Sequence, residues 1–455
     1  MKILNIILLL VLISLNKIES QTTTISFSSS GDGYTVSGNS VSISKEGNYE
    51  LKGSETDKRL VILSNCKIYL NSFSLINNQT IIPILIAGKF ITVELVLLGE
   101  STLQDTSVKY KNDREGVIFL HTGNSLKISG QGILNLNPRQ KWGIEGDDGS
   151  SLIVNDGTIN ISGNSGIGGI YLRKEIIFNN GIYNFNCSKS AEDALHTRGT
   201  IKLLKGKFNF NLKGAKGINA IESFYCGEKN GNNNDLELYI KTNKEAIQAK
   251  EIEINSGNIT IEADEDGINA ASVGNECDST KNCSGNCSCY FTFNGGNLHI
   301  LSEEDGVDSN GDMTITGGNI IIFSAADTMD GPLDYNGLLK VTGGNILGAG
   351  SCKLEKVEAS TTQIQKEYIG LIEKGSKLEI SDYNGNEILS LNTPKNATYI
   401  YFNYPQNISV KLNGNEMNLT IVESIEEEIP KIPAYGNYIK LELLLLLSLL
   451  IFIYI

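Results

Sequence analysis

One short unit recurs through the middle of the chain, and its spacing limits the folds that the sequence can adopt. The unit is a glycine followed by alternating residues, as in Gly157-Thr-Ile-Asn-Ile. Its glycines are separated by 25, 24, 25, 51, 39, 22 and 26 residues: Gly132, Gly157, Gly181, Gly206, Gly257, Gly296, Gly318 and Gly344. The interval of 51 fits two units, and the interval of 39 fits one unit with an inserted loop. A period of 22–26 residues accommodates three short strands that stack as rungs of a parallel β-helix.

Other repeat architectures fit this period less well. A leucine-rich repeat has a similar length, but its Leu/Asn template and its helical segment are missing here. A propeller blade of about 40 residues is too long. We therefore predict an all-β fold, with a right-handed parallel β-helix over residues 21–352 and a small β-rich segment over 353–425.

A second strand follows the same period and predicts which side chains stack. Its inward aliphatic ladder is expected to contain Ile144, Ile170, Leu195, Ile218, Ile247, Ile268 and Val307. The next residue in each rung faces outward and gives the column Glu145, Tyr171, His196, Asn219, Gln248, Asn269 and Asp308. Ligands that bind along the helix axis would meet this column.

Carboxylates and amides gather on the C-terminal rungs of this face. The candidate metal ligands are Asp264, Asp266, Asn269, Asp305, Asp308, Asp327, Asp330 and Asp334. Carboxylates stacked about 4.8 Å apart repel one another unless a cation lies between them. Ca²⁺ takes six to eight hard oxygen ligands of this kind, so we predict bound calcium here. The alternative is a solvated acidic turn.

Two of the few arginines, Arg173 and Arg198, follow Asp147 in one column. They are candidates for binding the carboxylates of a uronate polymer, together with Tyr171 and His196 beside them. The alternatives are a surface ion pair between Asp147 and Arg173, of small energetic value, and a surface polar role for His196.

The N-terminal end and the sequons indicate export. Residues 1–20 resemble a secretory signal peptide, with Lys2 ahead of a short apolar stretch. Nine asparagines stand in N-x-S/T sequons and are candidate glycosylation sites: Asn78, Asn160, Asn186, Asn258, Asn282, Asn286, Asn396, Asn407 and Asn418.

Eight cysteines in an exported chain indicate disulfides formed in an oxidising compartment. A loop at 272–290 holds four of the eight: Cys277, Cys283, Cys287 and Cys289. We expect disulfides within this loop and leave the three possible pairings open. Zinc is the alternative, although the spacing lacks paired C-x-x-C knuckles.

The C-terminal end predicts attachment to a membrane. A linker at 426–442 precedes an apolar tail at 443–455, which is too short to cross a bilayer comfortably. The tail suits a GPI signal with Ala434 or Gly436 as the attachment residue, or alternatively a short tail anchor. We therefore expect a secreted protein held at the cell surface. The net charge of −14 and the lack of basic runs make nucleic acid an unsuitable partner.

Three acidic motifs resemble a known family. They are Asp264-Glu-Asp-Gly-Ile-Asn-Ala, Glu304-Asp-Gly-Val-Asp-Ser-Asn-Gly-Asp and Met329-Asp-Gly-Pro-Leu-Asp-Tyr-Asn-Gly. They are similar to motifs of the secreted carbohydrate-binding β-helix proteins grouped around an acidic-polysaccharide-binding protein of cellulolytic clostridia. The resemblance covers roughly residues 33–425, whereas the cysteine loop and the C-terminal tail depart from the family pattern.

This resemblance implies a pectate-lyase-like β-helix, bound calcium and affinity for polygalacturonate-like glycans. It assigns the calcium to Asp266, Asn269, Asp305, Asp308, Asp330 and Asp334. Non-catalytic, calcium-dependent binding of acidic polysaccharide is the favoured function. The alternatives are a polysaccharide lyase, with calcium and an Arg or Lys base, and a structural surface-coat glycoprotein.

Overall fold

The computed structural model describes residues 22–425, with gaps at 79–81, 107–115, 140, 164–166, 188, 190–191, 273–288, 326–329, 355–356, 359, 361 and 423. The predicted signal peptide, the linker and the apolar tail with Ala434 and Gly436 lie outside the described residues. So do Asp327, Asn282, Asn286 and three of the loop cysteines, Cys277, Cys283 and Cys287. Within the part described, no helix is long and apolar enough to span a membrane.

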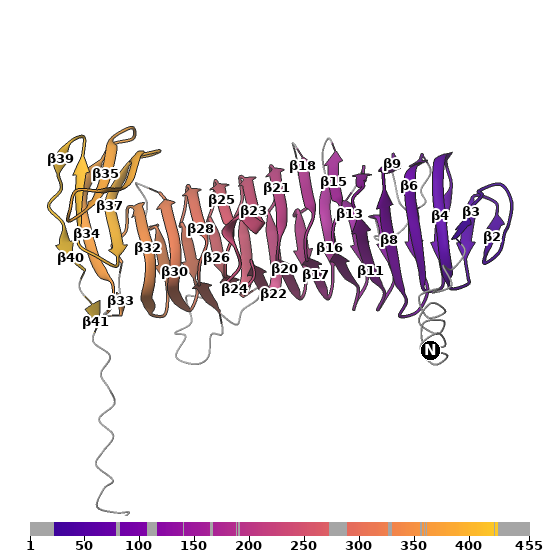
Figure 1. The fold of residues 1–455 in the computed structure, drawn as a ribbon, viewed down its shortest axis with the longest axis horizontal. Helices are drawn as coiled ribbons and strands as arrows, with labels where there is room; N and C mark the ends of the chain where they lie inside the picture. The colour runs from indigo at the N-terminus through magenta and orange to yellow at the C-terminus, as the bar shows by residue number, and fades with distance from the viewer. Residues whose placement is uncertain are drawn as a thin grey trace, which may run out of the picture.

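The chain winds into an elongated parallel β-helix whose rungs follow one another from the N-terminal end to the C-terminal end (Figure 1). Each rung contributes strands to three faces, and each strand pairs in parallel with its counterpart one rung on. The predicted parallel β-helix is therefore confirmed. A right-handed winding is the one that parallel crossover connections adopt.

The first face carries the outward column predicted from the sequence. Its strands are β3 (Ser40–Ile43), β5 (Arg59–Ile62), β7 (Ile84–Ile86), β10 (Gly116–Leu120), β13 (Lys141–Gly146), β16 (Ile167–Leu172), β19 (Leu195–Thr197), the starts of β22 (Ile218–Cys226) and β24 (Ile247–Ile254), β26 (Ile268–Ala270), β29 (Val307–Ser309) and β31 (Leu333–Tyr335).

The second face follows the first in each rung. Its strands are β1 (Thr22–Thr24), the starts of β4 (Gly47–Thr56) and β6 (Cys66–Asn77), β8 (Thr92–Leu98), β11 (Ser125–Gly130), β14 (Ser151–Val154), β17 (Glu175–Phe178), β20 (Thr200–Leu203), the ends of β22 and β24, β27 (Tyr290–Phe293), the starts of β30 (Asp312–Phe323) and β32 (Leu339–Gly350), and β33 (Val357–Glu358).

The third face completes the rung. Its strands are the ends of β4 and β6, β9 (Glu100–Asp105), β12 (Ile133–Asn137), β15 (Thr158–Gly163), β18 (Ile182–Cys187), β21 (Gly206–Leu212), β23 (Leu236–Thr242), β25 (Asn258–Ala263), β28 (Asn297–Ser302) and the ends of β30 and β32. A short 3₁₀ helix, η1 (Asn233–Asp235), precedes β23.

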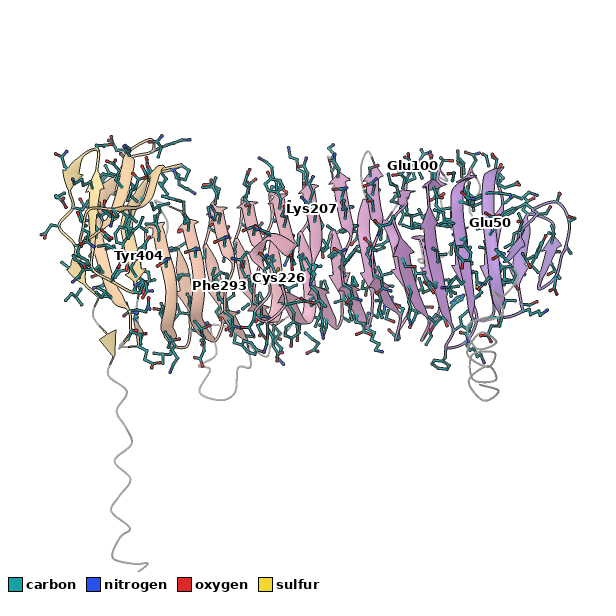
Figure 2. The ribbon with its side chains drawn as sticks, viewed as in Figure 1. Glu50, Glu100, Lys207, Cys226, Phe293 and Tyr404 are labelled. Carbon is teal, nitrogen blue, oxygen red and sulfur yellow. The ribbon has the colours of Figure 1, made fainter. Side chains whose placement is uncertain are left out.

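Aliphatic and aromatic side chains fill the interior, because every second residue of a strand points inward. Ile144, Ile170, Leu195 and Ile218 lie on successive rungs and are fully buried, as the ladder predicts. Figure 2 shows the side chains along the whole helix, and the labelled Phe293 belongs to the buried set. One continuous core therefore runs the length of the β-helix.

Asparagines at two positions of the repeated unit form ladders on the third face. Asn297 donates to Asn258 Oδ1 at 2.7 Å, Asn319 donates to Asn297 at 2.8 Å, and Asn345 donates to Asn319 at 2.9 Å. A shorter ladder joins Asn135, Asn160 and Asn184. These ladders link rungs through side chains as well as through the backbone.

Antiparallel strands close both ends of the helix. At the N-terminal end, β2 (Tyr34–Ser37) forms a hairpin with β3. At the C-terminal end, β37 (Ala397–Tyr404) pairs antiparallel with β32, and β34 (Ile364–Ile372) and β40 (Thr420–Ile421) follow it in the sheet. β41 (Ser424–Ile425) instead pairs in parallel with β33. A separate small sheet holds β35 (Lys377–Asp382), β36 (Glu387–Asn392), β38 (Ile408–Leu412) and β39 (Asn415–Glu416). The β-rich character predicted for this segment is thus confirmed.

Candidate functional site

Parallel pairing on the first face aligns one outward residue from each rung. From the middle of the helix to its C-terminal end, the column reads Phe119, Glu145, Tyr171, His196, Asn219, Gln248, Asn269, Asp308 and Asp334. This is the order that the sequence predicts, extended by one residue at each end. From Tyr171 onward, the column changes from aromatic to amide to carboxylate along the helix axis.

Three rings meet at the aromatic part of the column. Tyr171 and His196 contact edge to face with centroids 4.6 Å apart, and Trp142 lies 5.3 Å from Tyr171. The Arg173 guanidinium lies over the Tyr171 ring at 5.3 Å, in a cation–π arrangement. The candidate ligand residues Tyr171, His196 and Arg173 are therefore brought together, with the buried Trp142 behind them.

The two candidate arginines differ in what they contact. Arg173 Nη1 donates to Asp147 Oδ1 at 3.2 Å, and the Asp147 carboxylate is buried. The ion pair that we considered as an alternative is thus present. Arg198 is more exposed, and its Nη1 lies 3.6 Å from Oδ1 of the exposed Asp148. Arg198 is therefore the more accessible cation for an anionic ligand.

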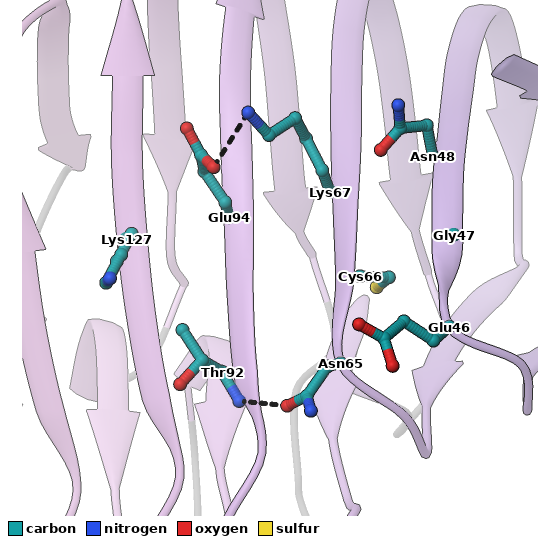
Figure 3. Close-up of a pocket in the computed structure, with 9 residues that line it drawn as sticks. All are labelled: Glu46, Gly47, Asn48, Asn65, Cys66, Lys67, Thr92, Glu94 and Lys127. Carbon is teal, nitrogen blue, oxygen red and sulfur yellow. Dashed lines mark hydrogen bonds and ion pairs between the residues drawn. The ribbon is translucent and has the colours of Figure 1, made fainter. Parts of the chain in front are cut away.

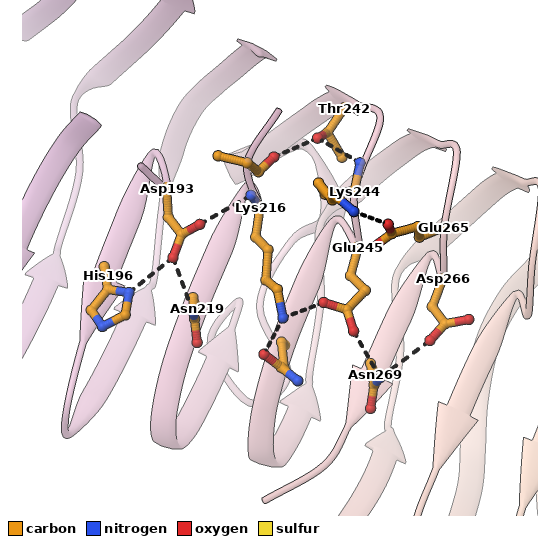
Figure 4. Close-up of polar contacts among 12 residues, drawn as sticks. Asp193, His196, Lys216, Asn219, Thr242, Lys244, Glu245, Glu265, Asp266 and Asn269 are labelled. Carbon is orange, nitrogen blue, oxygen red and sulfur yellow. Dashed lines mark hydrogen bonds and ion pairs between the residues drawn. The ribbon is translucent and has the colours of Figure 1, made fainter. Parts of the chain in front are cut away.

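Asp193 forms hydrogen bonds to two rungs next to the ring cluster. Its Oδ2 lies 2.8 Å from His196 Nδ1 and accepts from Asn219 Nδ2 at 2.9 Å. Its Oδ1 accepts the backbone N–H of Lys216 at 3.0 Å, one rung on (Figure 4). The sequence alone did not identify Asp193 as a residue that orients His196.

Ion pairs occupy the middle of the face (Figure 4). Lys216 pairs with Glu245, and Lys244 pairs with Glu265. Asn269 Nδ2 donates to Glu245 Oε1 at 3.1 Å, which connects this network to the acidic rungs. The cationic side chains of these rungs are thus already engaged by carboxylates.

The acidic rungs repeat the arrangement seen at Asp193. Asp266 Oδ1 accepts the backbone N–H of Asp305 at 3.1 Å, and Asp305 Oδ1 accepts that of Gly331 at 2.6 Å. Each carboxylate therefore binds the backbone of the next rung, which is a structural role that the sequence did not reveal.

Burial raises the pKa values of three of these carboxyl groups. The pKa of Asp305 rises to about 8, that of Asp266 to about 7 and that of Asp308 to about 7. Desolvation is the largest cause in each case, and neighbouring charges, such as that of Asp334 on Asp308, add to it. The cluster is therefore electrostatically costly when every member is ionised.

The donor chemistry of this cluster fits a hard cation. Its side chains offer carboxylate and amide oxygens, and the Oδ1 atom of the buried Asn269 has no hydrogen-bond partner. Across the described ranges, however, no three acidic, His or Cys side chains converge to form a metal site by themselves. A cation held by Asp266, Asn269 and Asp308 would therefore need further oxygens from backbone, water or ligand.

The other predicted metal ligands on these rungs are Asp264, Asp330 and Asp334. Asp264 is exposed and Asp330 is half-buried, with its backbone carbonyl accepting from Ser351 at 2.6 Å. Asp334 is exposed but stays in register with Asp308. The structure therefore groups Asp266, Asn269, Asp305, Asp308 and Asp334, and leaves Asp264 at the surface.

The described sequons fall into two groups. Asn160 and Asn258 use their Nδ2 atoms in hydrogen bonds, at 2.9 Å to Asn135 and 3.2 Å to the Asn233 carbonyl. The remaining described sequon asparagines are exposed: Asn78, Asn186, Asn396, Asn407 and Asn418. Glycosylation stays a prediction, and exposure favours the second group. Cys289 is buried where the loop rejoins β27, and the predicted disulfides of that loop also stay a prediction.

A polar groove lies outside the first face, near the N-terminal end. This groove of about 480 Å³ is lined by Glu46, Gly47, Asn48, Asn65, Cys66, Lys67, Thr92, Glu94 and Lys127 (Figure 3). Lys67 and Glu94 form an ion pair at 3.0 Å, and Asn65 accepts the Thr92 backbone N–H at 2.8 Å. In the sequence we followed the repeated unit only from Gly132 onward, which gave no signal for the groove.

Comparison with known proteins gives a family model and a solved structure. A solved structure, the polysaccharide lyase-like protein from C. thermocellum in a gadolinium derivative, aligns with 71% of this chain and 98% of its own at 17% identity. Its TM-score of 0.28 is too low to carry an argument, so the fold rests on the strand pairing above. No curated protein matches the chain. A family model described as "Carbohydrate-binding domain-containing protein" matches residues 37–331 and 232–377. The chain therefore belongs to this family of carbohydrate-binding domain-containing proteins.

Proposed function

We propose that this protein binds acidic polysaccharide along the first face of its β-helix, with calcium, and without cleaving it. The family is described as carbohydrate-binding, and the proposal adds the class of carbohydrate and the face of the β-helix that binds it. The observation that carries it is that one face of the helix presents the half-buried Tyr171 and His196 rings, the exposed Arg198 in the turn beside them and, further along the same column, a cluster of carboxylates.

The cationic end supports an anionic ligand. Arg198 is accessible, and its partner Asp148 is itself largely exposed, so this pair is weak and easily replaced. A uronate carboxylate can accept two parallel hydrogen bonds from the Arg198 guanidinium. The Tyr171 and His196 rings beside it offer apolar and hydrogen-bonding surface to the sugar.

The acidic end supports a calcium ion. Asp266, Asn269 and Asp308 would hold the ion, and the ion would neutralise carboxylates that burial makes costly to ionise. A uronate could complete the coordination with its own oxygens, which links calcium to binding. Placement at the cell surface follows from the predicted signal peptide and C-terminal tail.

The test is binding of the full chain to polygalacturonate and to a neutral glucan, with calcium and with chelator. We expect calcium-dependent binding to polygalacturonate alone. Asp308→Asn should weaken the calcium dependence, and Arg198→Ala should weaken binding itself. Lys202→Ala is the matched control, because Lys202 is a cation on the second face, over the Tyr225 ring.

Two results would contradict this proposal. Equal binding with and without calcium would show that binding does not depend on the metal. Release of unsaturated oligosaccharides, detected by their ultraviolet absorbance, would show a lyase instead of a non-catalytic binding protein.

A further inference from the structure

An exposed aromatic side chain stands in a strained conformation near the N-terminal end of the first face. Phe90 lies in the turn between β7 and β8, its side chain is 78% exposed, and its φ is +54°. In the described ranges, the other non-glycine residues with positive φ are Asp57, Ser72, Asn230 and Asn413. These are small polar residues, of which Asn and Asp tolerate this region best, whereas a bulky side chain there is a genuine outlier.

A single buried side chain holds this turn in place. Asn124 is fully buried, and its Oδ1 accepts the backbone N–H of Ile91 at 2.9 Å. Its Nδ2 donates to the carbonyls of Ile86 at 3.0 Å and Gly88 at 2.8 Å. The three hydrogen bonds span the turn on both sides of Phe90, so the ring is presented from a fixed backbone.

The neighbouring rung leaves room for the ring. A Cβ atom at Gly123 would clash with the Phe90 ring, so the ring lies against a glycine of the next rung. Gly123 in turn donates its N–H to the Asp148 carbonyl at 2.9 Å, one rung further on. Phe90 is therefore backed by rigid backbone while most of the ring faces solvent.

The ring belongs to a row that runs along the helix axis. After Phe90 and Gly123, the same turn carries Gly149, Arg173 and Arg198 on successive rungs, because each of these residues stands two positions before the aligned start of the following strand. Asp148, next to Gly149, has its Oδ1 3.7 Å from Arg173 Nε and 3.6 Å from Arg198 Nη1. Four rungs at about 4.8 Å place Arg198 about 19 Å from Phe90.

We propose that Phe90 is a sugar-stacking platform on which one pyranose ring of the bound glycan rests, while a carboxylate of the same chain reaches Arg198. This inference rests on the proposed function and adds a subsite with a direction along the helix. A pyranose presents an apolar C–H face, and an exposed phenyl ring offers it a matching apolar surface. Because Asn124 fixes the backbone of this turn, little backbone freedom is lost on binding.

Backbone strain at an exposed aromatic residue supports this role. Burial of the ring does not offset the strain, because most of the ring is in solvent. Strain of this kind is held by the surrounding structure and is concentrated at ligand-binding sites. Replacement of Phe90 should therefore reduce binding without reducing stability.

The experiment measures affinity of the full chain for a panel of acidic and neutral glycans in calcium. Phe90→Ala and Phe90→Gly are compared with Phe90→Tyr, which keeps a ring. Tyr383→Ala is the matched control, since Tyr383 is 77% exposed on the C-terminal sheet. We expect the first two variants to lose about tenfold in affinity, equivalent to about 1.4 kcal/mol. The Tyr variant and the control should stay close to the parent.

The melting temperature distinguishes lost contact from lost folding. Phe90→Gly should melt at or above the parent temperature, because glycine adopts positive φ without strain. Parent-like affinity of both Phe90→Ala and Phe90→Gly would show that Phe90 does not contact the glycan, and would not contradict the proposed function. Binding of a neutral glycan alone, weakened by Phe90→Ala, would keep the platform and overturn the acidic ligand. No binding to any glycan would overturn both.

Discussion

The carboxylate of Asp266 accepts a hydrogen bond from the backbone N–H of Asp305, 3.1 Å away and one rung further along the helix. Asp305 binds Gly331 in the same way, and Asp193 binds Lys216. These aspartates therefore join consecutive rungs even without a metal ion. Burial, and to a lesser extent the charges of neighbouring carboxylates, raise the pKa values of Asp266 and Asp305, which makes this region sensitive to pH.

Metal-free protein should lose stability as the pH rises from about 4 to about 8. The pKa of Asp305 in the folded state, about 8, is far above its usual value of 3.8 because of burial. The folded state therefore keeps a proton that the unfolded state releases, and this stabilisation disappears as the pH approaches the folded pKa. Melting curves at a series of pH values in chelator test this, and calcium should restore stability most at pH 8.

Asp305→Asn is the variant that isolates the charge. Its amide oxygen can still accept the Gly331 N–H, so the bond between rungs is kept while the titrating group is removed. We expect this variant to flatten the pH profile and to gain on the order of 1 kcal/mol at pH 8 in chelator. A parent-like decline in the variant would show that Asp305 is not the source.

The asparagine ladder of the third face should contribute measurably to stability. Asn297→Ala removes two ladder hydrogen bonds, to Asn258 and from Asn319, whereas Asn345→Ala removes one. At about 0.5–1.5 kcal/mol for each bond, the interior substitution should cost about 1–3 kcal/mol and the terminal one about half as much. Urea unfolding of the two variants measures the difference. Equal costs would mean that the ladder does not act through these bonds.

Gly169 should not tolerate a side chain. A Cβ atom there would clash with the carbonyl oxygen of Ala194 and with the Tyr183 hydroxyl, both fixed by a 2.9 Å hydrogen bond between them. Gly169→Ala should therefore destabilise the helix by about 1–3 kcal/mol. Gly47→Ala is the control, because its Cβ would meet Tyr49 at an ordinary 3.6 Å. Similar melting temperatures for the two variants would contradict this explanation.

Deletion of residues 443–455 should release the protein into the medium. The apolar tail is the segment that we predict to direct membrane attachment, by a GPI signal or as a tail anchor. Fractionation of cells that express the full and the shortened chain measures the outcome, with the signal peptide kept in both. Unchanged membrane association of the shortened chain would show that attachment depends on another segment.

The sequence by itself determined the architecture and the register of its central rungs. The repeated glycine unit and the alternation of apolar residues are local properties, and stacking at a fixed period converts them directly into columns. Ile144, Ile170 and Leu195 could therefore be assigned to the interior, and Tyr171 and His196 to the outer face, without coordinates. Before residue 130 the unit does not recur at a regular interval, and the sequence alone gave those rungs no register.

Only the tertiary structure decided which polar atoms meet. Asp266 and the N–H of Asp305 are 39 residues apart, and Asn124 and the turn it holds are more than 30 apart. The loops between rungs vary in length, so sequence spacing does not fix which turn lies beside which carboxylate. Burial is also a property of the whole fold. Burial raises the pKa of Asp305, and the fold leaves Phe90 exposed while Phe293 lies in the core.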